Sequence, residues 1–198
     1  MQKIVIATHN KGKVIEIRDL LKKYNFKIYS LEKFSNIEPK ENGKTFIENS
    51  IIKAVNAVRV TNLPSIADDS GLCVQALNND PGIYSARWAG KNKNFTLAAK
   101  KIQKKLDDKF RIDKVNLRAF FYCALTIALP SGTIKSYEGK VYGSLQFPPK
   151  GVNGFGYDPI FVPNGYKKTF GEMKYSFKER ISHRRKAFNK LEKFLISF

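Results

Sequence analysis

A polar and cationic run, Thr8-His9-Asn10-Lys11-Gly12-Lys13, separates a β-branched segment from a segment with apolar residues at helical spacing. The N–H groups at a helix N-terminus lack partners and carry partial positive charge, and Lys11 and Lys13 add full charges beside them. Phosphate groups bind at such places. The glycine spacing and the Lys-Ser/Thr pair of a Walker A loop are missing. Taken alone, the run is more simply a polar loop that caps the helix.

Two adjacent carboxylates occur in Asp68-Asp69-Ser70-Gly71. We predict a strand, an acidic turn and a second strand over residues 65–77, which places both carboxylates at strand ends. Adjacent carboxylates cannot both enter a core without severe desolvation. They are therefore surface turn residues, the simpler interpretation of the isolated motif, or ligands of a hard cation.

Further carboxylates precede this motif. Glu41 lies on a loop just ahead of Asn42-Gly43, and Glu48 lies near the start of the next predicted helix. Magnesium typically takes one or two protein carboxylates together with phosphate oxygens and waters. Glu41 and Asp69 would therefore suffice as the protein ligands of Mg²⁺.

The glycine-rich segment Gly154-Phe155-Gly156-Tyr157-Asp158-Pro159 contains Phe155, which we expect to be exposed, followed by a tyrosine and an aspartate. Glycine lets the backbone approach a ligand closely, and an aromatic ring can stack on a base. Asp158 can accept or orient hydrogen bonds. A ligand-binding loop and a structural turn fit this segment equally well.

Cations surround the expected start of the last helix. Lys178 precedes Ser182-His183-Arg184, in which Ser182 has the chemistry of an N-cap and leaves the next residues exposed on the first turn. Cations at a helix N-terminus oppose the helix dipole, so their presence favours a functional role. For His183 alone, a structural histidine is the commoner case.

The elements that position these residues follow from hydrophobic spacing, strand composition and turn residues. They mix without a regular alternation of strand and helix, so we expect a single α/β domain over residues 1–198, with a mixed sheet, flanking helices and no Rossmann topology. Helices are predicted over residues 14–24, 45–60, 95–106 and from 182 to the C-terminus, and strands over 3–8, 27–31, 117–129 and 134–145.

The formal net charge is +19. Such a charge points first to nucleic acid, but lysine far outnumbers arginine and is spread over most predicted helices. A bias toward AT-rich codons at tolerant surface positions explains this pattern better than a dedicated nucleic-acid surface. General attraction for polyphosphate is a further alternative.

Sequence features also bound the cellular environment. Cys73 and Cys123 have no neighbouring ligand at metal-site spacing, so both are expected to be reduced and buried. No segment approaches the roughly 18 apolar residues of a membrane span, and the apolar run at residues 4–7 is too short for a signal peptide. We expect a soluble cytoplasmic protein without a membrane partner.

Together, these segments resemble the inosine triphosphate pyrophosphatase family, most closely its bacterial dITP/XTP branch. The resemblance covers nearly the whole chain and depends on the order and spacing of the motifs. It rests on Thr8 to Lys13, Glu41, Thr45-Phe46-Ile47-Glu48-Asn49, Lys53-Ala54, Ala67 to Leu72, Pro81 to Arg87, Gly154 to Pro159 and Ile181 to Arg184.

The resemblance implies an elongated two-lobed α/β fold with the nucleotide in a central cleft, a homodimer, and hydrolysis of inosine or xanthosine triphosphates to a monophosphate and pyrophosphate. Lys40 and Phe177 stand where many relatives have acidic residues. The alternatives are an enzyme for modified pyrimidine or standard triphosphates and a basic nucleic-acid-binding protein.

The resemblance also implies a role for each motif. The triphosphate would be contacted by Thr8, His9, Asn10, Lys11, Gly12, Lys13 and Lys53, and Mg²⁺ would be held by Glu41 and Asp69, with Asp69 also the general base. The nucleotide would be contacted by Ser70, Phe155, Gly156, Tyr157 and Asp158, and the 6-oxo purine would be recognised by Lys178, His183 and Arg184.

Overall fold

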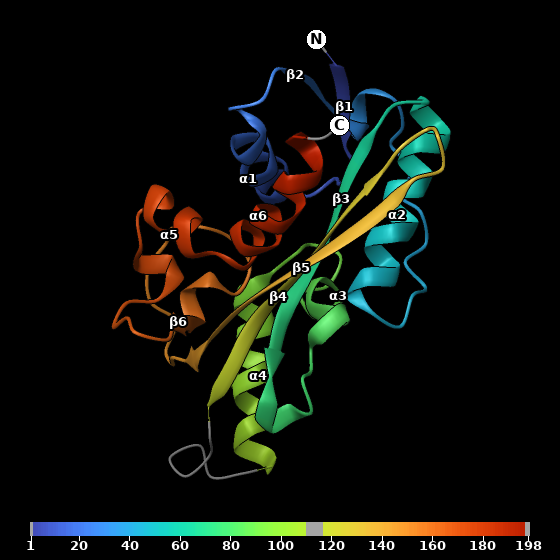
Figure 1. The fold of residues 1–198 in the computed structure, drawn as a ribbon. Coiled ribbons are helices and arrows are strands. Elements are labelled where there is room, and N and C mark those ends of the chain that lie inside the picture. Colours follow the sequence, from blue (N-terminus) through green and yellow to red (C-terminus); the bar gives the residue numbers. More distant parts are fainter. Residues whose placement is uncertain (1, 110–116, 197–198) are drawn as a thin grey trace. The chain divides into compact units, whose positions relative to one another are not determined.

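The sheet of the computed structural model is mixed, as predicted. Over residues 2–109 and 117–196, which are those the structure describes, its strand order is β2-β1-β3-β4-β5-β6 (Figure 1). The β1 strand pairs in parallel with β2 and β3, whereas β5 and β6 are antiparallel. The strands are β1 (Gln2–Ile6), β2 (Phe26–Ser30), β3 (Ser65–Val74), β4 (Arg118–Ala128), β5 (Ile134–Leu145) and β6 (Phe161–Pro163).

The helices confirm each of the four predicted helical segments. The side chain of Thr45 caps α2 by accepting the N–H of Glu48, which fixes the start of this helix. The short helices α3 and α5 were not predicted from hydrophobic spacing. The helices are α1 (Lys11–Leu21), α2 (Phe46–Thr61), α3 (Ser85–Trp88), α4 (Phe95–Lys109), α5 (Tyr175–Ile181) and α6 (His183–Ile196).

The prediction of an acidic turn within residues 65–77 is wrong. The β3 strand continues from Ser65 to Val74 without interruption, so Asp68 and Asp69 lie inside a strand. Both side chains are buried, at 0% and 6% exposure. The desolvation argument for a turn fails because each carboxylate pairs with a cation inside the protein.

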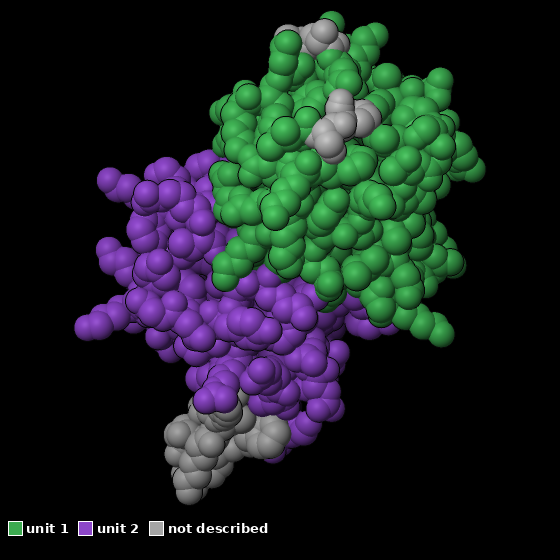
Figure 2. Space-filling model, viewed as in Figure 1, with its two compact units in different colours: residues 1–69, 123–139, 183–198 green, residues 70–122, 140–182 purple. Residues whose placement is uncertain are grey.

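The chain divides into two compact units (Figure 2). Unit 1 comprises residues 1–69, 123–139 and 183–198, and unit 2 comprises residues 70–122 and 140–182. The β3, β4 and β5 strands each contribute residues to both units. The expectation of two lobes that share a sheet agrees with this division.

The core of unit 1 has two layers of side chains because alternate residues of a strand point to opposite faces of a sheet. Ile4 and Ile6 of β1 pack with α1 and α6, whereas Val5 and Ala7 pack with α2. Figure 1 shows α1 and α6 together, with α2 on the other face. The end of β1 and the starts of α1 and α6 thereby come together within one unit.

The core of unit 2 is rich in aromatic side chains. Phe121, Phe161 and Phe170 pack against one another with ring centroids 4.7 to 6.0 Å apart. Buried residues of α4, including Ile102 and Leu106, belong to the same cluster. This core supports the glycine-rich segment that precedes β6.

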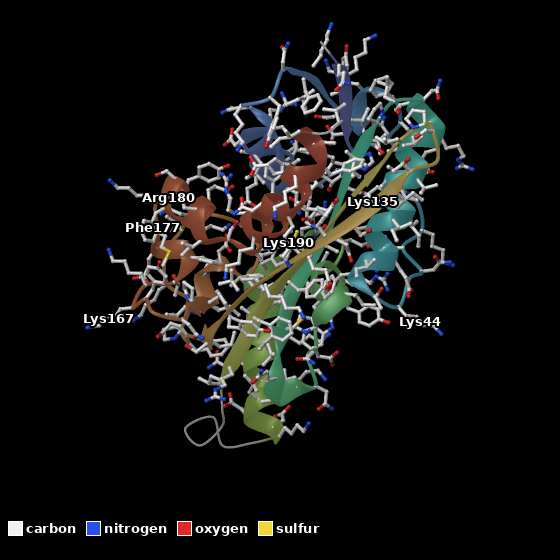
Figure 3. All side chains as sticks on the ribbon, in the orientation of Figure 1. Lys44, Lys135, Lys167, Phe177, Arg180 and Lys190 are labelled. Atoms are coloured by element: carbon white, nitrogen blue, oxygen red, sulfur yellow. The ribbon has the colours of Figure 1, made fainter. Side chains whose placement is uncertain are left out.

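Lysines are exposed on separate segments of the chain, and both cysteines are buried, as predicted. In unit 1, Lys44, Lys135 and Lys190 are exposed and come from three separate segments (Figure 3). Cys73 and Cys123 are buried free thiols. Across the described residues, every helix is too short or too polar to span a membrane.

Candidate active site

The Thr8 to Lys13 run connects β1 to α1, as predicted. Asn10 is the N-cap of α1, and its side chain accepts the N–H of Lys13 at 3.2 Å. The hydroxyl of Thr8 accepts the N–H of Asn10 at 3.2 Å. The run therefore folds into a turn at a helix N-terminus, which is a place suited to phosphate groups.

His9 ties this turn to the segment that precedes Glu41. Its Nδ1 lies 3.0 Å from the carboxylate of Glu38, and its Nε2 lies 3.2 Å from the carbonyl oxygen of Ser35. Both ring nitrogens thus contact residues 35–38. The contacts hold the segment beside the turn.

A buried ion-pair network joins this turn to β3 and α6. Asp68 accepts a hydrogen bond from Arg184 Nε at 2.9 Å, and Lys13 Nζ lies 2.5 Å from its other oxygen. Arg184 also pairs through Nη1 with Glu16 of α1. Burial disfavours the charge of Asp68, but Arg184 and Lys13 outweigh this effect and hold its pKa well below the usual range.

Cys123 completes the network. Its thiol donates to Asp68 at 3.0 Å. Burial, reinforced by the charge of Asp68, raises the pKa of Cys123 well above its ordinary value. The thiol therefore stays protonated and acts as a hydrogen-bond donor.

The expected exposure of the start of α6 is wrong. Arg184 and His183 are only 1% and 5% exposed. Burial opposes the charge of Arg184, yet Asp68 and Glu16 raise its pKa well above the ordinary value. These carboxylates account for the presence of a cation at this helix N-terminus, so the helix dipole gives no argument for a ligand here.

A second ion cluster in unit 1 contains both carboxylates that were expected to hold Mg²⁺. The ammonium of Lys53 lies 2.7 Å from Glu41 Oε1 and 2.8 Å from Asp69 Oδ1. Burial alone lowers the pKa of Lys53, but the two carboxylates raise it above its ordinary value. Burial raises the pKa of Asp69, although Lys53 and Lys13 oppose this shift.

The residues of this cluster fit a hard divalent cation. Glu41 and Asp69 converge on a single cationic atom, Lys53 Nζ. Among the described residues, Asp69 Oδ2 is buried and has no hydrogen-bond partner. No group of three His, Cys, Asp or Glu side chains gathers in residues 2–109 and 117–196. Two carboxylates completed by substrate oxygens is the arrangement that magnesium favours.

Glu48 does not join this cluster. Its carboxylate accepts the backbone N–H of Lys44 at 2.7 Å, and the residue is exposed. It therefore stabilises the start of α2.

In unit 2, the glycine-rich segment and Lys178 form a compact cluster. Lys178 Nζ lies 2.6 Å from Asp158 Oδ2 and 4.8 Å from the centre of the Phe155 ring. Asp158 also accepts the N–H of Phe155 at 2.8 Å. Gly154 has a φ of +75°, and a Cβ there would lie 2.0 Å from Asp158 Oδ2, so this position requires glycine.

Phe155 is less exposed than the sequence suggested. Phe155 is half-buried, and Tyr157 is 3% exposed. The Tyr157 hydroxyl donates to the Ser85 carbonyl at 2.9 Å, and its ring packs edge-on against Phe95. Tyr157 therefore anchors the segment to the core of unit 2. Ser70, the other residue of this unit that was expected to contact the nucleotide, is half-buried.

The sequence did not reveal the partners of the buried arginine. Glu16 was not singled out, and Asp68 was considered only as a surface turn residue or a ligand of a hard cation, yet both contact Arg184. The signal for Glu16 is its spacing, because it precedes the core residue Leu20 by four and so lies on the apolar face of α1. A carboxylate on such a face requires a buried cation.

The chain is similar to known proteins over nearly its whole length. Residues 4–194 match the Ham1 family. A dITP/XTP pyrophosphatase of Caulobacter vibrioides is 48% identical over 190 residues, which cover 96% of each chain. A dITP/XTP pyrophosphatase of Zymomonas mobilis is 44% identical over 96% of this chain and 90% of its own length.

Solved structures agree with these sequence relatives. A HAM1 protein from Coxiella burnetii superimposes with a TM-score of 0.89 at 36% identity, with full coverage of both chains. The Ham1 protein of Staphylococcus aureus gives a TM-score of 0.87 at 38% identity over 99% of each chain. The α/β fold expected from the sequence is confirmed by these similarities.

Proposed function

The chain belongs to the Ham1 family, and on this premise we propose that it hydrolyses the triphosphates of inosine, deoxyinosine and xanthosine to a monophosphate and pyrophosphate. The observation that carries the proposal is the convergence of Glu41 and Asp69 on one buried cationic position in unit 1. The phosphate-type turn at residues 8–13 belongs to the same unit. Hydrolysis removes these nucleotides before they enter DNA or RNA.

Asp69 would act as the general base for attack of water on the α-phosphorus. A base works best when its pKa lies near the working pH, and burial moves the pKa of Asp69 upward in that direction. Lys53 and the turn with Lys13 supply positive charge for the triphosphate. Glu41 and Asp69 would hold Mg²⁺, which when bound neutralises charge on the phosphates.

The purine would be recognised through donors that match its 6-oxo group. Lys178 and His183 are donors of this kind, and Phe155 offers a ring face for stacking. The role proposed for Arg184 is indirect, because its Nε and Nη1 already contact Asp68 and Glu16. A 6-amino purine would set donor against donor, a mismatch that buried polar sites reject by roughly 10⁴-fold.

The test is turnover of a nucleotide panel with separate detection of pyrophosphate and orthophosphate. We expect pyrophosphate as the first product, a strong preference for inosine and xanthosine over adenosine triphosphate, and loss of turnover with a chelator that added Mg²⁺ restores. Orthophosphate as the first product would contradict the proposal. A preference for pyrimidine or standard triphosphates would support the alternative enzyme. If the protein instead bound nucleic acid without hydrolysing nucleotides, and its affinity fell steeply with salt concentration, it would be a nucleic-acid-binding protein.

A homodimer in the cytoplasm, with residues 1–198 as one catalytic domain, is part of the same proposal. It follows from the family resemblance. Sedimentation at micromolar concentration should show a species of twice the monomer mass of 22.6 kDa. A 22.6 kDa species alone would contradict the dimer.

A further inference from the structure

Asn49 lies in the first turn of α2 and is completely buried. Its side-chain oxygen accepts the backbone N–H of Gly43 at 2.9 Å. The next N–H along the chain, that of Lys44, donates to Glu48 at 2.7 Å. Two consecutive amides just after Glu41 are therefore held by two consecutive side chains of one helix turn.

The same helix also contacts the side chain of Glu41. Asn49 and Lys53 are four residues apart, so they lie on one face of α2. Lys53 Nζ lies 2.7 Å from Glu41 Oε1. Glu41 is thus fixed at two points, at its side chain by Lys53 and at its following backbone by Asn49.

Gly43 allows this close approach. A Cβ at residue 43 would lie 2.7 Å from Asn49 Oδ1 and 2.7 Å from Glu48 Cβ, which is closer than side chains tolerate. Any larger residue would move the segment away from α2. The contact between Gly43 and Asn49 therefore sets how near Glu41 lies to the helix.

Only the oxygen of the Asn49 side-chain amide makes a hydrogen bond within the described residues. Asn49 Nδ2 is buried and, within the described residues, makes no hydrogen bond. A buried polar group without a partner costs about 1–3 kcal/mol. The carbonyl oxygen bonded to Gly43 is thus the functional end of the side chain.

We propose that Asn49 is a positioning residue for the metal ligand Glu41. This inference rests on the proposed function, in which Glu41 and Asp69 hold Mg²⁺. Asn49 acts through the Gly43 amide and touches neither metal nor nucleotide. Partners that orient a metal ligand typically change metal affinity or activity by 10–100-fold when they are removed.

The test compares Asn49→Ala with Asn56→Ala. Asn56 lies seven residues further along the same helix, and its side-chain oxygen accepts a hydrogen bond from Arg59 at 3.1 Å. Asn49→Ala should raise the Mg²⁺ concentration for half-maximal turnover by about tenfold or more. The turnover at saturating Mg²⁺ should stay within about threefold of the original, because the reacting groups are unchanged. Asn56→Ala should change neither quantity.

Direct binding of Mn²⁺, followed by electron paramagnetic resonance, gives a readout that does not depend on turnover. With the α,β-methylene analogue of deoxyinosine triphosphate present, Asn49→Ala should bind Mn²⁺ about tenfold more weakly. An unchanged Mn²⁺ affinity would overturn the inference. If the original protein hydrolysed no nucleotide or needed no metal, the proposed function itself would fail, so the two failures are distinguishable.

Gly43→Ala disturbs the same contact at its other partner, the backbone of residue 43. This variant tests the inference if Asn49→Ala does not fold. It should weaken Mn²⁺ binding in the same way. Where both variants fold, the double variant should show less than the sum of the two single effects in free energy, because both act through one contact. Additive effects, or a Gly43→Ala variant with normal Mn²⁺ affinity, would contradict the role of Asn49.

Discussion

Asp69→Asn should lower the turnover of inosine triphosphate by about 100-fold or more, because metal placement and the general base are lost together. The substitution keeps the size of the side chain while removing its charge. Nucleotide affinity should stay within about tenfold, since the turn at residues 8–13 and the unit 2 cluster around Lys178 are unchanged. Single-turnover hydrolysis and nucleotide binding should be measured on the same preparation.

The fold should survive this substitution, although the reason differs from the one that the sequence offers. Asp69 is a buried strand residue that accepts a hydrogen bond from Lys53 at 2.8 Å. An asparagine oxygen can accept the same bond, and Lys53 retains Glu41. Asp107→Asn, on the exposed surface of α4, is the matched control and should behave as the original protein. Near-normal hydrolysis by Asp69→Asn would remove Asp69 from the mechanism, whereas a large loss of thermal stability would make its role structural.

Local patterns predicted the four long helices and most strands correctly, because such elements follow local rules. For example, the apolar residues of α2 recur at three and four positions, and Thr45 marks its start. The short α5 escaped prediction because its seven residues span barely two turns, too few for a periodic pattern. The pattern of β3 failed for a different reason, since two acidic residues interrupt its apolar run.

Residue type and order indicated the candidate site from the sequence, but they did not indicate which side chains pair with one another. Glu41 and Asp69 are 28 positions apart, yet both contact Lys53. A single sequence does not reveal which cation neutralises which carboxylate. For that reason Arg184 was expected on the surface, Asp68 was not expected to pair with it, and Glu16 was not expected in the site at all.

The buried network around Arg184 leads to the largest expected effect on stability. Arg184→Met replaces a fully buried guanidinium by an apolar side chain of similar length and leaves Glu16 and Asp68 buried. Asp68 still has Lys13 at 2.5 Å, but Glu16 loses its contact with Arg184. Breaking a buried ion pair by removing one partner typically costs about 3–5 kcal/mol of folding free energy.

Urea unfolding would measure this loss, with Arg180→Met as the matched control. Arg180 is exposed and stacks on Phe177 at 5.2 Å (Figure 3), so its loss should change the free energy of unfolding by less than about 0.5 kcal/mol. The double variant Glu16→Gln and Arg184→Met should recover part of the stability, because it removes the buried carboxylate charge that Arg184 no longer neutralises and leaves the Asp68–Lys13 pair intact. If Arg184→Met instead unfolded like the original protein and only lost its preference for inosine over adenosine triphosphate, Arg184 would contact the base directly and the buried network would not be its main role.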